Sequence, residues 1–258
     1  MRHCKAFSLA EVLITLGVIG VVVAVTLPTL ISNHNKHVWE NGLKTSYSIF
    51  SQAFQKMMAD DGVDNIADTE VFRAINGTSC RYDSGVNSDV CKNFYSLFKK
   101  YIKITKISTL NNYRYYNLSK TSNYLLSSGD GIFLSNGALL FSYSFRSSDN
   151  NTDKPDCKDV VALGGKMCSN MGMIFVDING YAKPNTFGRD IYAFIISQNG
   201  NLVPYLGKDS ALYNEQTALE NNSVYWKNNN KCDVSDTSET SGYGCAARII
   251  ENGWKMDY

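Results

Sequence analysis

The sequence predicts an α+β fold in which one long N-terminal helix packs on an antiparallel β-sheet held by disulfides. Three observations predict it. An almost unbroken apolar run extends from Phe7 to Leu27, and an amphipathic pattern continues it to about residue 59. Short strand-like segments separated by turn residues fill most of the remainder. Together these features favour a membrane-anchored helix with a packed domain behind it.

The composition argues against several functions. The chain has 25 basic and 24 acidic side chains, and a net charge of +1 gives no reason to expect a general nucleic-acid binder. Its three histidines, His3, His34 and His37, all lie near the N-terminus. The rest of the chain therefore lacks the imidazole of a Ser-His-Asp or Cys-His site, and histidine ligands for a zinc enzyme. We expect that the protein is not an enzyme.

The apolar run is long enough to cross a membrane. At about 1.5 Å per residue it spans roughly 32 Å, which matches the hydrocarbon core of a bilayer. Arg2 and Lys5 precede it, so the N-terminus is expected on the cytoplasmic side. Glu11 interrupts the run. A carboxylate within hydrocarbon costs about 2.5–3.5 kcal/mol, so Glu11 either lies near the membrane end and reaches the headgroups or has a specific partner.

The helix is predicted to continue beyond Pro28 and to end at Asp60-Asp61-Gly62. We expect a transmembrane half over residues 7–30, an amphipathic half over 31–60 and an exported globular domain over 61–258. The apolar stripe of the second half recurs every three or four residues and consists of Leu43, Tyr47, Phe50, Phe54 and Met57.

Within the globular domain, a short helix is predicted from Val90 to Ile104. Asn136-Gly137 and Asn199-Gly200 are strong hairpin signals between apolar segments. The predicted strands are Gly131–Leu134, Ala138–Phe145, Met173–Ile178, Ile191–Ser197 and Leu202–Leu206.

The N-terminal segment FSLAEVLITLGVIGVVVAVTLPTL follows a short basic leader that ends in a small residue. It carries Glu as its fifth residue, and this whole pattern resembles the class III prepilin signal of type IV pilins and type II secretion pseudopilins. The resemblance covers about residues 1–60 and implies a pilin-like fold. It implies that a prepilin peptidase removes the leader, residues 1–6, by cleavage between Ala6 and Phe7, and that Phe7 is then N-methylated.

The resemblance also implies roles in assembly. Glu11 would pair with the N-terminal amine of a neighbouring subunit, and two buried charges would then offset each other. Pro28 stands where members of this family often carry a helix-kinking proline. The chain departs from the family pattern at Ala6, which replaces the usual glycine, and at Ala10, which replaces a larger aliphatic residue.

The cysteines indicate a disulfide framework. Cys4 lies in the leader, which leaves an even number in the exported body. Six cysteines allow 15 connectivities, and the sequential one is the simplest because each pair closes a short loop. The last loop resembles the C-terminal disulfide-bounded loop of many pilins. The sequential pairs are Cys80–Cys91, Cys157–Cys168 and Cys232–Cys245.

Two further constellations are candidate binding sites. The first is a glycine-containing segment with the oxygen-bearing side chains of Asp177, Asn179, Asn185 and Asp190, which could hold calcium. Some pseudopilins bind calcium in a loop of the globular domain. The spacing lacks the terminal Glu of an EF-hand, so Asx turns that bridge strands are the alternative. No other cofactor is expected.

The second constellation is a stretch from Val90 to Gly129 without Asp or Glu. It interleaves basic residues with aromatic ones, a pattern that could hold DNA. The alternative is a solvated basic face with tyrosines that pack in the sheet. The basic candidates are Lys99, Lys100, Lys103 and Arg114.

These features predict a structural subunit, minor rather than major, of a type IV pilus-like or type II secretion pseudopilus filament. Its expected partners are other pilin or pseudopilin subunits, the prepilin peptidase, an inner-membrane assembly platform and membrane lipid. We expect a single-pass protein of the bacterial inner membrane, with its body exported to the periplasm or to a surface filament. The alternative is a membrane-tethered or tip-located binding module for DNA uptake or surface adhesion.

Overall fold

The computed structural model describes residues 8–75, 79–81, 89–126, 129–146, 170–206 and 231–258. The chain divides into two units, Met1–Val38 and Trp39–Tyr258. The helix α1, Leu9–Asp61, contributes to both. Each unit is described by itself below, and the boundaries that the sequence places at residues 6, 30 and 60 stay predictions.

In the first unit, α1 is apolar around most of its circumference from Leu9 to Ile31, and its side chains there are exposed. Among the helices that the structure describes, α1 alone is long and apolar enough to cross a membrane. Two threonines within the apolar part are satisfied locally: the hydroxyl groups of Thr15 and Thr26 donate to the carbonyl oxygens of Glu11 and Val22, each at 2.9 Å. Pro28 lies inside the helix, where its missing N–H removes one backbone hydrogen bond.

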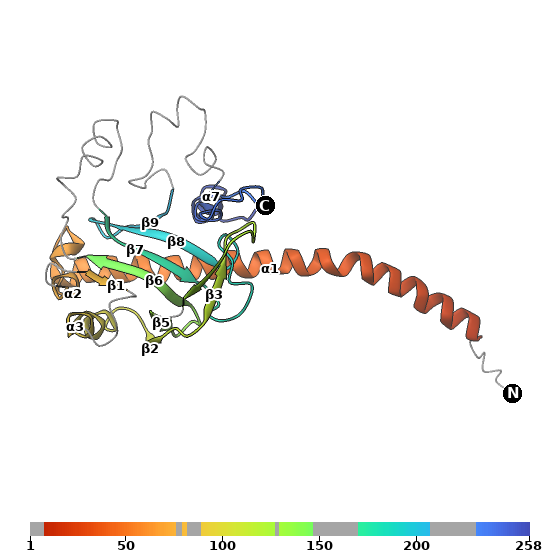
Figure 1. Ribbon diagram of the computed structural model, residues 1–258, viewed down its shortest axis with the longest axis horizontal. Helices are drawn as coiled ribbons and strands as arrows, with labels where there is room; N and C mark the ends of the chain where they lie inside the picture. The colour runs from red at the N-terminus through yellow and green to blue at the C-terminus, as the bar shows by residue number, and fades with distance from the viewer. Residues whose placement is uncertain (1–7, 76–78, 82–88, 127–128, 147–169, 207–230) are drawn as a thin grey trace, which may run out of the picture. The chain divides into compact units, whose positions relative to one another are not determined.

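The second unit combines short helices with antiparallel strands (Figure 1). Among the described residues, α1 is followed by the 3₁₀-helix η1, Ile66–Asp68, and by the α-helices α2, Glu70–Arg73; α3, Asp89–Phe98; and α7, Cys245–Glu251. The strands are β1, Ser79–Arg81; β2, Ile104–Thr109; β3, Tyr113–Tyr116; β4, Asn123–Leu126; β5, Asp130–Leu134; β6, Leu139–Arg146; β7, Asn170–Asp177; β8, Ile191–Ser197; and β9, Leu202–Pro204.

Seven of these strands form one sheet, in the order β2-β5-β6-β7-β8-β9, with β1 paired to β6. Every pairing is antiparallel. The hairpins predicted at Asn136-Gly137 and Asn199-Gly200 connect β5 to β6 and β8 to β9, and both glycines have positive φ. Strands β3 and β4 form a separate two-stranded sheet.

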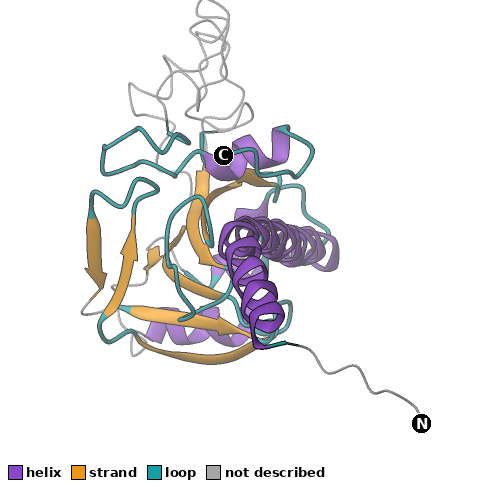
Figure 2. Cartoon of the chain, turned by 90° about the vertical axis from the view of Figure 1, so that its right-hand side faces the viewer, coloured by secondary structure: helices purple, strands orange, loops and turns teal. Residues whose placement is uncertain are grey.

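Both faces of the large sheet are covered. Alternate residues of β8 enter two different clusters: Tyr192, Phe194 and Ile196 pack in the cluster that contains the second half of α1, whereas Ile191 and Ala193 pack with the β3–β4 hairpin. Figure 2 shows α1 and this hairpin on opposite sides of the sheet. All seven residues of β8 are consequently buried, which explains why this strand reads as an unbroken apolar run.

The α1 face of the sheet is held by a cluster of aromatic side chains. Phe72 lies at its centre, with ring centroids 6.4 Å from Phe54 and 6.2 Å from both Phe94 and Phe145. All four side chains have 0% exposure. This cluster joins α1, α2, α3 and β6, so the amphipathic stripe predicted for the second half of α1 is the inner face of the domain.

The predicted α+β architecture is confirmed: a long N-terminal helix with an antiparallel sheet packed on its second half. The helix predicted from Val90 to Ile104 is too long, because α3 ends at Phe98 and Ile104 already begins β2. The tyrosine-rich β3–β4 hairpin, β2 and the C-terminal α7 were not predicted. They lack the apolar alternation on which the other strands were predicted.

We expect Phe72→Ala to lower the free energy of unfolding by about 3–5 kcal/mol, because it opens a cavity where four secondary-structure elements meet. Phe72→Leu, which keeps most of the buried volume, should cost less than about 2 kcal/mol. Denaturant unfolding of the detergent-solubilised chain measures both values. Equal losses in the two variants would contradict a tightly packed cluster at this position.

Candidate assembly site

The N-terminal end of α1 forms a reciprocal capping box between Ser8 and Glu11. The backbone N–H and hydroxyl of Ser8 both donate to Oε2 of Glu11, at 2.8 and 2.9 Å, and the backbone N–H of Glu11 donates to Oγ of Ser8 at 3.3 Å. The pair satisfies backbone donors that a helix start otherwise leaves free. The carboxylate predicted to act in assembly thus has hydrogen-bond partners within its own chain. Ala6 and Phe7 lie outside the described residues.

On both sides of Glu11, the N-terminal part of the helix presents a continuous apolar surface. Leu9 is 81% exposed and Val25 is 70% exposed. Full burial of one such side chain is worth about 1.5–3 kcal/mol, so a surface of this extent requires lipid or protein around it. The other large apolar side chains exposed within the first unit are Val12, Leu13, Ile14, Leu16, Val18, Ile19, Val21, Val22, Val23, Leu27, Leu30, Ile31 and Val38.

Within the second unit, the end of the chain is fastened to α1. The backbone N–H of Met256 donates to Oε1 of Glu40 at 2.7 Å. The ring of Trp254 lies 5.3 Å from that of Tyr47 in an edge-to-face arrangement, and the ammonium of Lys44 lies 6.0 Å from the same indole. These contacts link residues about 200 positions apart and fix the C-terminal segment on the helix that carries the membrane anchor.

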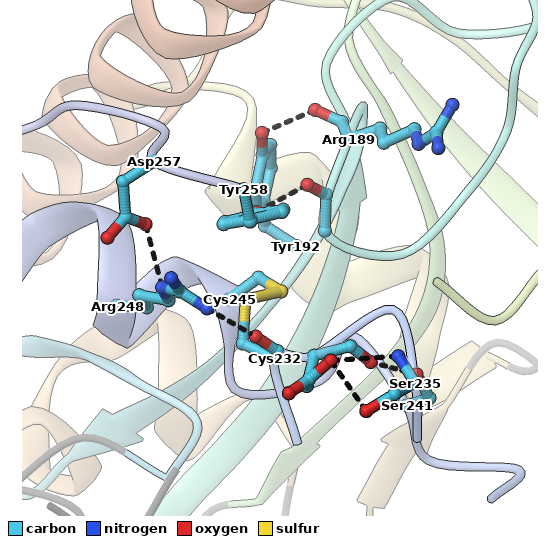
Figure 3. Close-up of a disulfide and its surroundings, with 11 residues drawn as sticks. Arg189, Tyr192, Cys232, Ser235, Ser241, Cys245, Arg248, Asp257 and Tyr258 are labelled. Carbon is cyan, nitrogen blue, oxygen red and sulfur yellow. Dashed lines mark hydrogen bonds and ion pairs between the residues drawn. A yellow bond between two sulfur atoms is a disulfide. The ribbon is translucent and has the colours of Figure 1, made fainter. Parts of the chain in front are cut away.

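A disulfide organises the C-terminal loop (Figure 3). Cys232 and Cys245 are bonded with Cα atoms 4.7 Å apart. The guanidinium of Arg248 donates to the carbonyl oxygen of Cys232 at 2.7 Å and pairs with the carboxylate of Asp257 at 2.7 Å. It also lies 5.0 Å from the ring of Tyr258. The disulfide, α7 and the chain end therefore form one connected assembly.

Two of the three sequentially predicted disulfides lie in the described part of the chain. Cys80 of β1 is bonded to Cys91 of α3 with a Cα separation of 5.4 Å, and the second is the Cys232–Cys245 bond. Cys157 and Cys168 lie outside the described residues. Both observed bonds close short segments, because the paired cysteines are only 11 and 13 positions apart in the sequence.

The calcium candidates are brought together in one buried loop. Both carboxylates, of Asp177 and Asp190, are 0% exposed. Asp177 accepts the hydroxyl proton of Tyr113 at 2.5 Å and the backbone N–H of Asn179 at 3.0 Å. Asp190 accepts the backbone N–H groups of Asn185 and Thr186 at 2.8 and 2.7 Å. Asp177 thus forms an Asx turn with Asn179, whereas Asp190 accepts from backbone N–H groups that precede it in the chain.

Calcium takes six to eight oxygen ligands, and these carboxylates already accept hydrogen bonds from their own loop. Within the described ranges, no group of three or more His, Cys, Asp or Glu side chains is placed to hold a metal ion. Oδ1 of Asn185 is buried and accepts no hydrogen bond from a described residue, so it is free to act as a ligand. Calcium binding at this loop stays a prediction.

Burial raises the pKa values of both carboxyl groups. The pKa of Asp177 lies well above its ordinary value because the group is desolvated and faces the charge of Asp190. Burial raises the pKa of Asp190 to about 6, against the lowering effect of the N–H groups of Thr186 and Asn185. In the C-terminal loop, by contrast, the N–H and hydroxyl of Ser235 lower the pKa of Asp233.

The basic candidates are exposed, but several of their aromatic neighbours are buried and not available for stacking. Lys99, Lys100 and Lys103 lie between α3 and β2, whereas Arg114 lies on β3 in the other sheet. Lys100 pairs with Glu70 at 3.4 Å. The interleaved rings of Phe94, Tyr95 and Tyr113 are at most 3% exposed and belong to the core. Part of the pattern that suggested base stacking is therefore a packing pattern, and nucleic-acid binding by these residues stays a prediction.

Sequence reasoning missed several of these contacts. The partner of Glu11 could have been found, because Ser8-x-x-Glu11 has the spacing of a capping box. The hydrogen bond from Tyr113 to Asp177 spans 64 residues, and the Met256–Glu40 bond spans 216. No local pattern indicates such pairs.

The raised pKa of Asp190 and the lowered pKa of Asp233 predict opposite effects of pH on the stability of the fold. A raised pKa means that the folded state binds the proton more tightly, so the contribution of Asp190 to stability falls as the pH rises from about 4 to about 6. Asp190→Asn should remove a decline of at most about 3 kcal/mol over that range.

Asp233 has a lowered pKa, so its contribution to stability is present at neutral pH and is lost on acidification. Asp233→Asn should remove that loss. Denaturant unfolding between pH 2 and 7 measures both slopes, and a change of the same sign in the two variants would contradict this assignment.

Comparison with known proteins adds two matches. The prokaryotic N-terminal methylation motif matches residues 1–27, and a family of unknown function (DUF6613) matches residues 29–258. No curated protein and no solved structure matches the chain. The methylation motif is the class III prepilin signal of type IV pilins and pseudopilins, and it ends where the second match begins. The chain therefore belongs to the family of unknown function DUF6613, with the N-terminus and the α+β layout of a type IV pilin or pseudopilin.

Proposed function

We propose that the protein is a structural subunit of a type IV pilus-like or type II secretion pseudopilus filament and performs no chemistry of its own. The observation that carries this proposal is the methylation motif over residues 1–27, continued by a helix whose apolar surface is unburied. A prepilin peptidase cleaves between Ala6 and Phe7, and the new N-terminus is methylated. The mature subunit then waits in the inner membrane on its apolar helix.

Assembly exchanges one apolar environment for another. An assembly platform extracts the subunit from the membrane, and the first half of α1 packs among the helices of its neighbours. Transfer of this surface to water would cost on the order of tens of kcal/mol, whereas transfer from lipid to a helical filament core avoids that cost. The extraction step therefore has a moderate free-energy requirement only if helix packing accompanies it.

Glu11 determines the axial position of the incoming subunit. In a filament core of low polarity, the carboxylate and the N-terminal amine of a neighbour offset each other, and either charge alone would be costly. In the single subunit, Ser8 keeps the carboxylate hydrogen-bonded. Exchange of these neutral donors for an ammonium group adds the attraction between two full opposite charges, which is strong in a core of low polarity.

The globular domain faces away from the membrane on the exported side. The disulfides support this placement, because such bonds persist in oxidising compartments and are rare in the cytosol. Nearly 200 residues follow α1. That size favours a minor subunit over one that is repeated along the whole filament.

The processing step is tested on protein isolated from membranes, with and without the prepilin peptidase. We expect the intact mass and N-terminal sequence to report a chain that begins at methylated Phe7 only when the peptidase is present. A chain that still begins at Met1, or that is cut after Leu27, would contradict the filament pathway. The tethered binding module would then be the better interpretation.

The role of Glu11 is tested by Glu11→Ala in the full chain. We expect incorporation into sheared filaments to fall by at least about tenfold, because the neighbour's amine is left buried without its partner. Glu70→Ala, which removes an exposed carboxylate of the globular domain, is the matched control and should assemble normally. Normal incorporation of Glu11→Ala would show that the carboxylate has no part in assembly.

A further inference from the structure

The globular domain has a hollow beside the second half of α1. Its volume is about 260 Å³, which is below the roughly 300–1,000 Å³ of pockets that take whole small-molecule ligands. A space of this size suits a single side chain of a partner. Its lining residues come from α1, from the segment between α3 and β2, and from the turn between β5 and β6.

The hollow has an apolar floor and a positively charged rim. Ile49, Ala53 and Leu134 contribute apolar surface, and Lys56 and Lys103 contribute ammonium groups. Lys56 is neutralised by Asp60 at 2.7 Å. Lys103 is exposed and has no ion-pair partner among the residues that the structure describes. The hollow therefore favours an aliphatic side chain that carries negative charge beside it.

The C-terminal disulfide loop presents such a group. Val234 is 56% exposed, and Asp233 precedes it directly. Among the described residues after α1, the exposed large apolar side chains are Val234, Leu125 and Tyr181. The segment enclosed by Cys232 and Cys245 contains three acidic residues and no basic ones. Its exposed tip is thus an aliphatic side chain in an acidic surrounding.

The loop holds this tip in a fixed conformation. The carboxylate of Asp233 accepts the N–H and the hydroxyl of Ser235, both at 2.8 Å. Asp236 accepts the N–H and the hydroxyl of Ser238, at 2.9 and 2.8 Å, and lies 3.8 Å from the ammonium of Lys231. A loop already ordered in the free subunit loses less conformational entropy on binding.

The two surfaces lie on different sides of the domain. Figures 1 and 2 both show α7, which follows the loop directly, on one side of the sheet, with α3 and β2 on another. The tip of one molecule therefore meets the hollow of a second copy rather than its own. Such a contact joins two different surfaces of identical subunits, so each subunit can bind a further one. Unless the rotation between neighbours closes the series into a ring, the repeated contact generates a helical filament.

We infer that the Val234 tip of the C-terminal loop docks into the Lys103-rimmed hollow of an adjacent copy of this chain. This inference rests on the proposed filament function and adds the contact between globular domains. The docking contact requires only two adjacent copies of the chain. A minor subunit meets this requirement if it enters the filament in short runs.

Cross-linking in assembled filaments tests the position of the contact. The full chain carries Val234→Cys together with Gln52→Cys, whose native side chain lines the hollow, and a short bismaleimide is added to filaments. We expect a ladder of linked subunits that begins with the dimer and extends as far as each run of adjacent copies. Leu125→Cys with Gln52→Cys is the control, because Leu125 is exposed on the β3–β4 hairpin, and it should give no ladder. An absent ladder, equal ladders in both pairs, or linkage of Gln52→Cys to a different protein would overturn the inference.

Charge exchange tests the complementarity. Lys103→Glu should lower the cross-linked fraction by about fivefold, and addition of Glu239→Lys, an exposed loop position, should restore most of it. Lys255→Glu makes the same change of net charge away from the hollow and should have no effect. Equal effects of the two lysine substitutions, or no restoration in the double variant, would overturn the inference.

The wild-type chain separates this inference from the proposed function. If the wild-type chain is not processed and never enters filaments, the proposed function fails and the docking contact falls with it. If the wild-type chain assembles and the engineered pair does not link, only the docking contact is wrong.

Discussion

The structure depends on a single helix that must suit two environments. In its first unit α1 exposes apolar side chains in every direction, so it requires lipid or other helices around it. Within the second unit of the chain, one face of the same helix is completely buried, with Leu43, Phe50 and Phe54 at 0% exposure. Because the two segments share one continuous backbone, any force that acts on the membrane anchor is transmitted to the core of the globular domain.

The packing of that core decides which surfaces remain for interaction. The central strands of the sheet are covered by α1 on one face and by the β3–β4 hairpin on the other. Their side chains are therefore not available to a partner. Contacts must instead come from the edges of the domain, and the lysine-rimmed hollow and the C-terminal loop are both located there. A fold closed on both faces leaves recognition to its connecting segments, as is common for loops on a rigid scaffold.

Sequence patterns predicted the parts of the fold that follow local rules. Strands β5, β6, β7 and β8 combine apolar alternation with Asn-Gly turns or continuous apolar runs, and each was predicted. The hairpin β3–β4 was missed because its tyrosines differ in burial and give no clear alternation: Tyr113 is 1% exposed, whereas Tyr115, Tyr116 and Tyr124 are half-buried. Helix α3 was extended too far because Tyr101 and Ile102 continue its apolar spacing into a turn.

The candidate site also has residues that the sequence could reveal and contacts that it could not. The residues of the N-terminal motif were recognisable because the motif is a contiguous pattern, and the Ser8–Glu11 pair has a spacing that a sequence can reveal. For Asp177 the sequence allowed either a calcium ligand or an Asx turn, but its hydroxyl donor, Tyr113, could not be predicted because it lies on a different sheet. The contact of Glu40 with Met256 depends on the whole tertiary fold and has no local counterpart.

The short spans of the observed disulfides bear on how the protein matures after export. Bonds between cysteines that are 11 and 13 positions apart join thiols that are neighbours even in a disordered chain. Pairing of Cys80 or Cys91 with either cysteine near the C-terminus would need a loop of well over a hundred residues, which is entropically disfavoured. Oxidation can therefore reach the native pairs of these four cysteines with little need for isomerisation, whether or not the sheet has already formed.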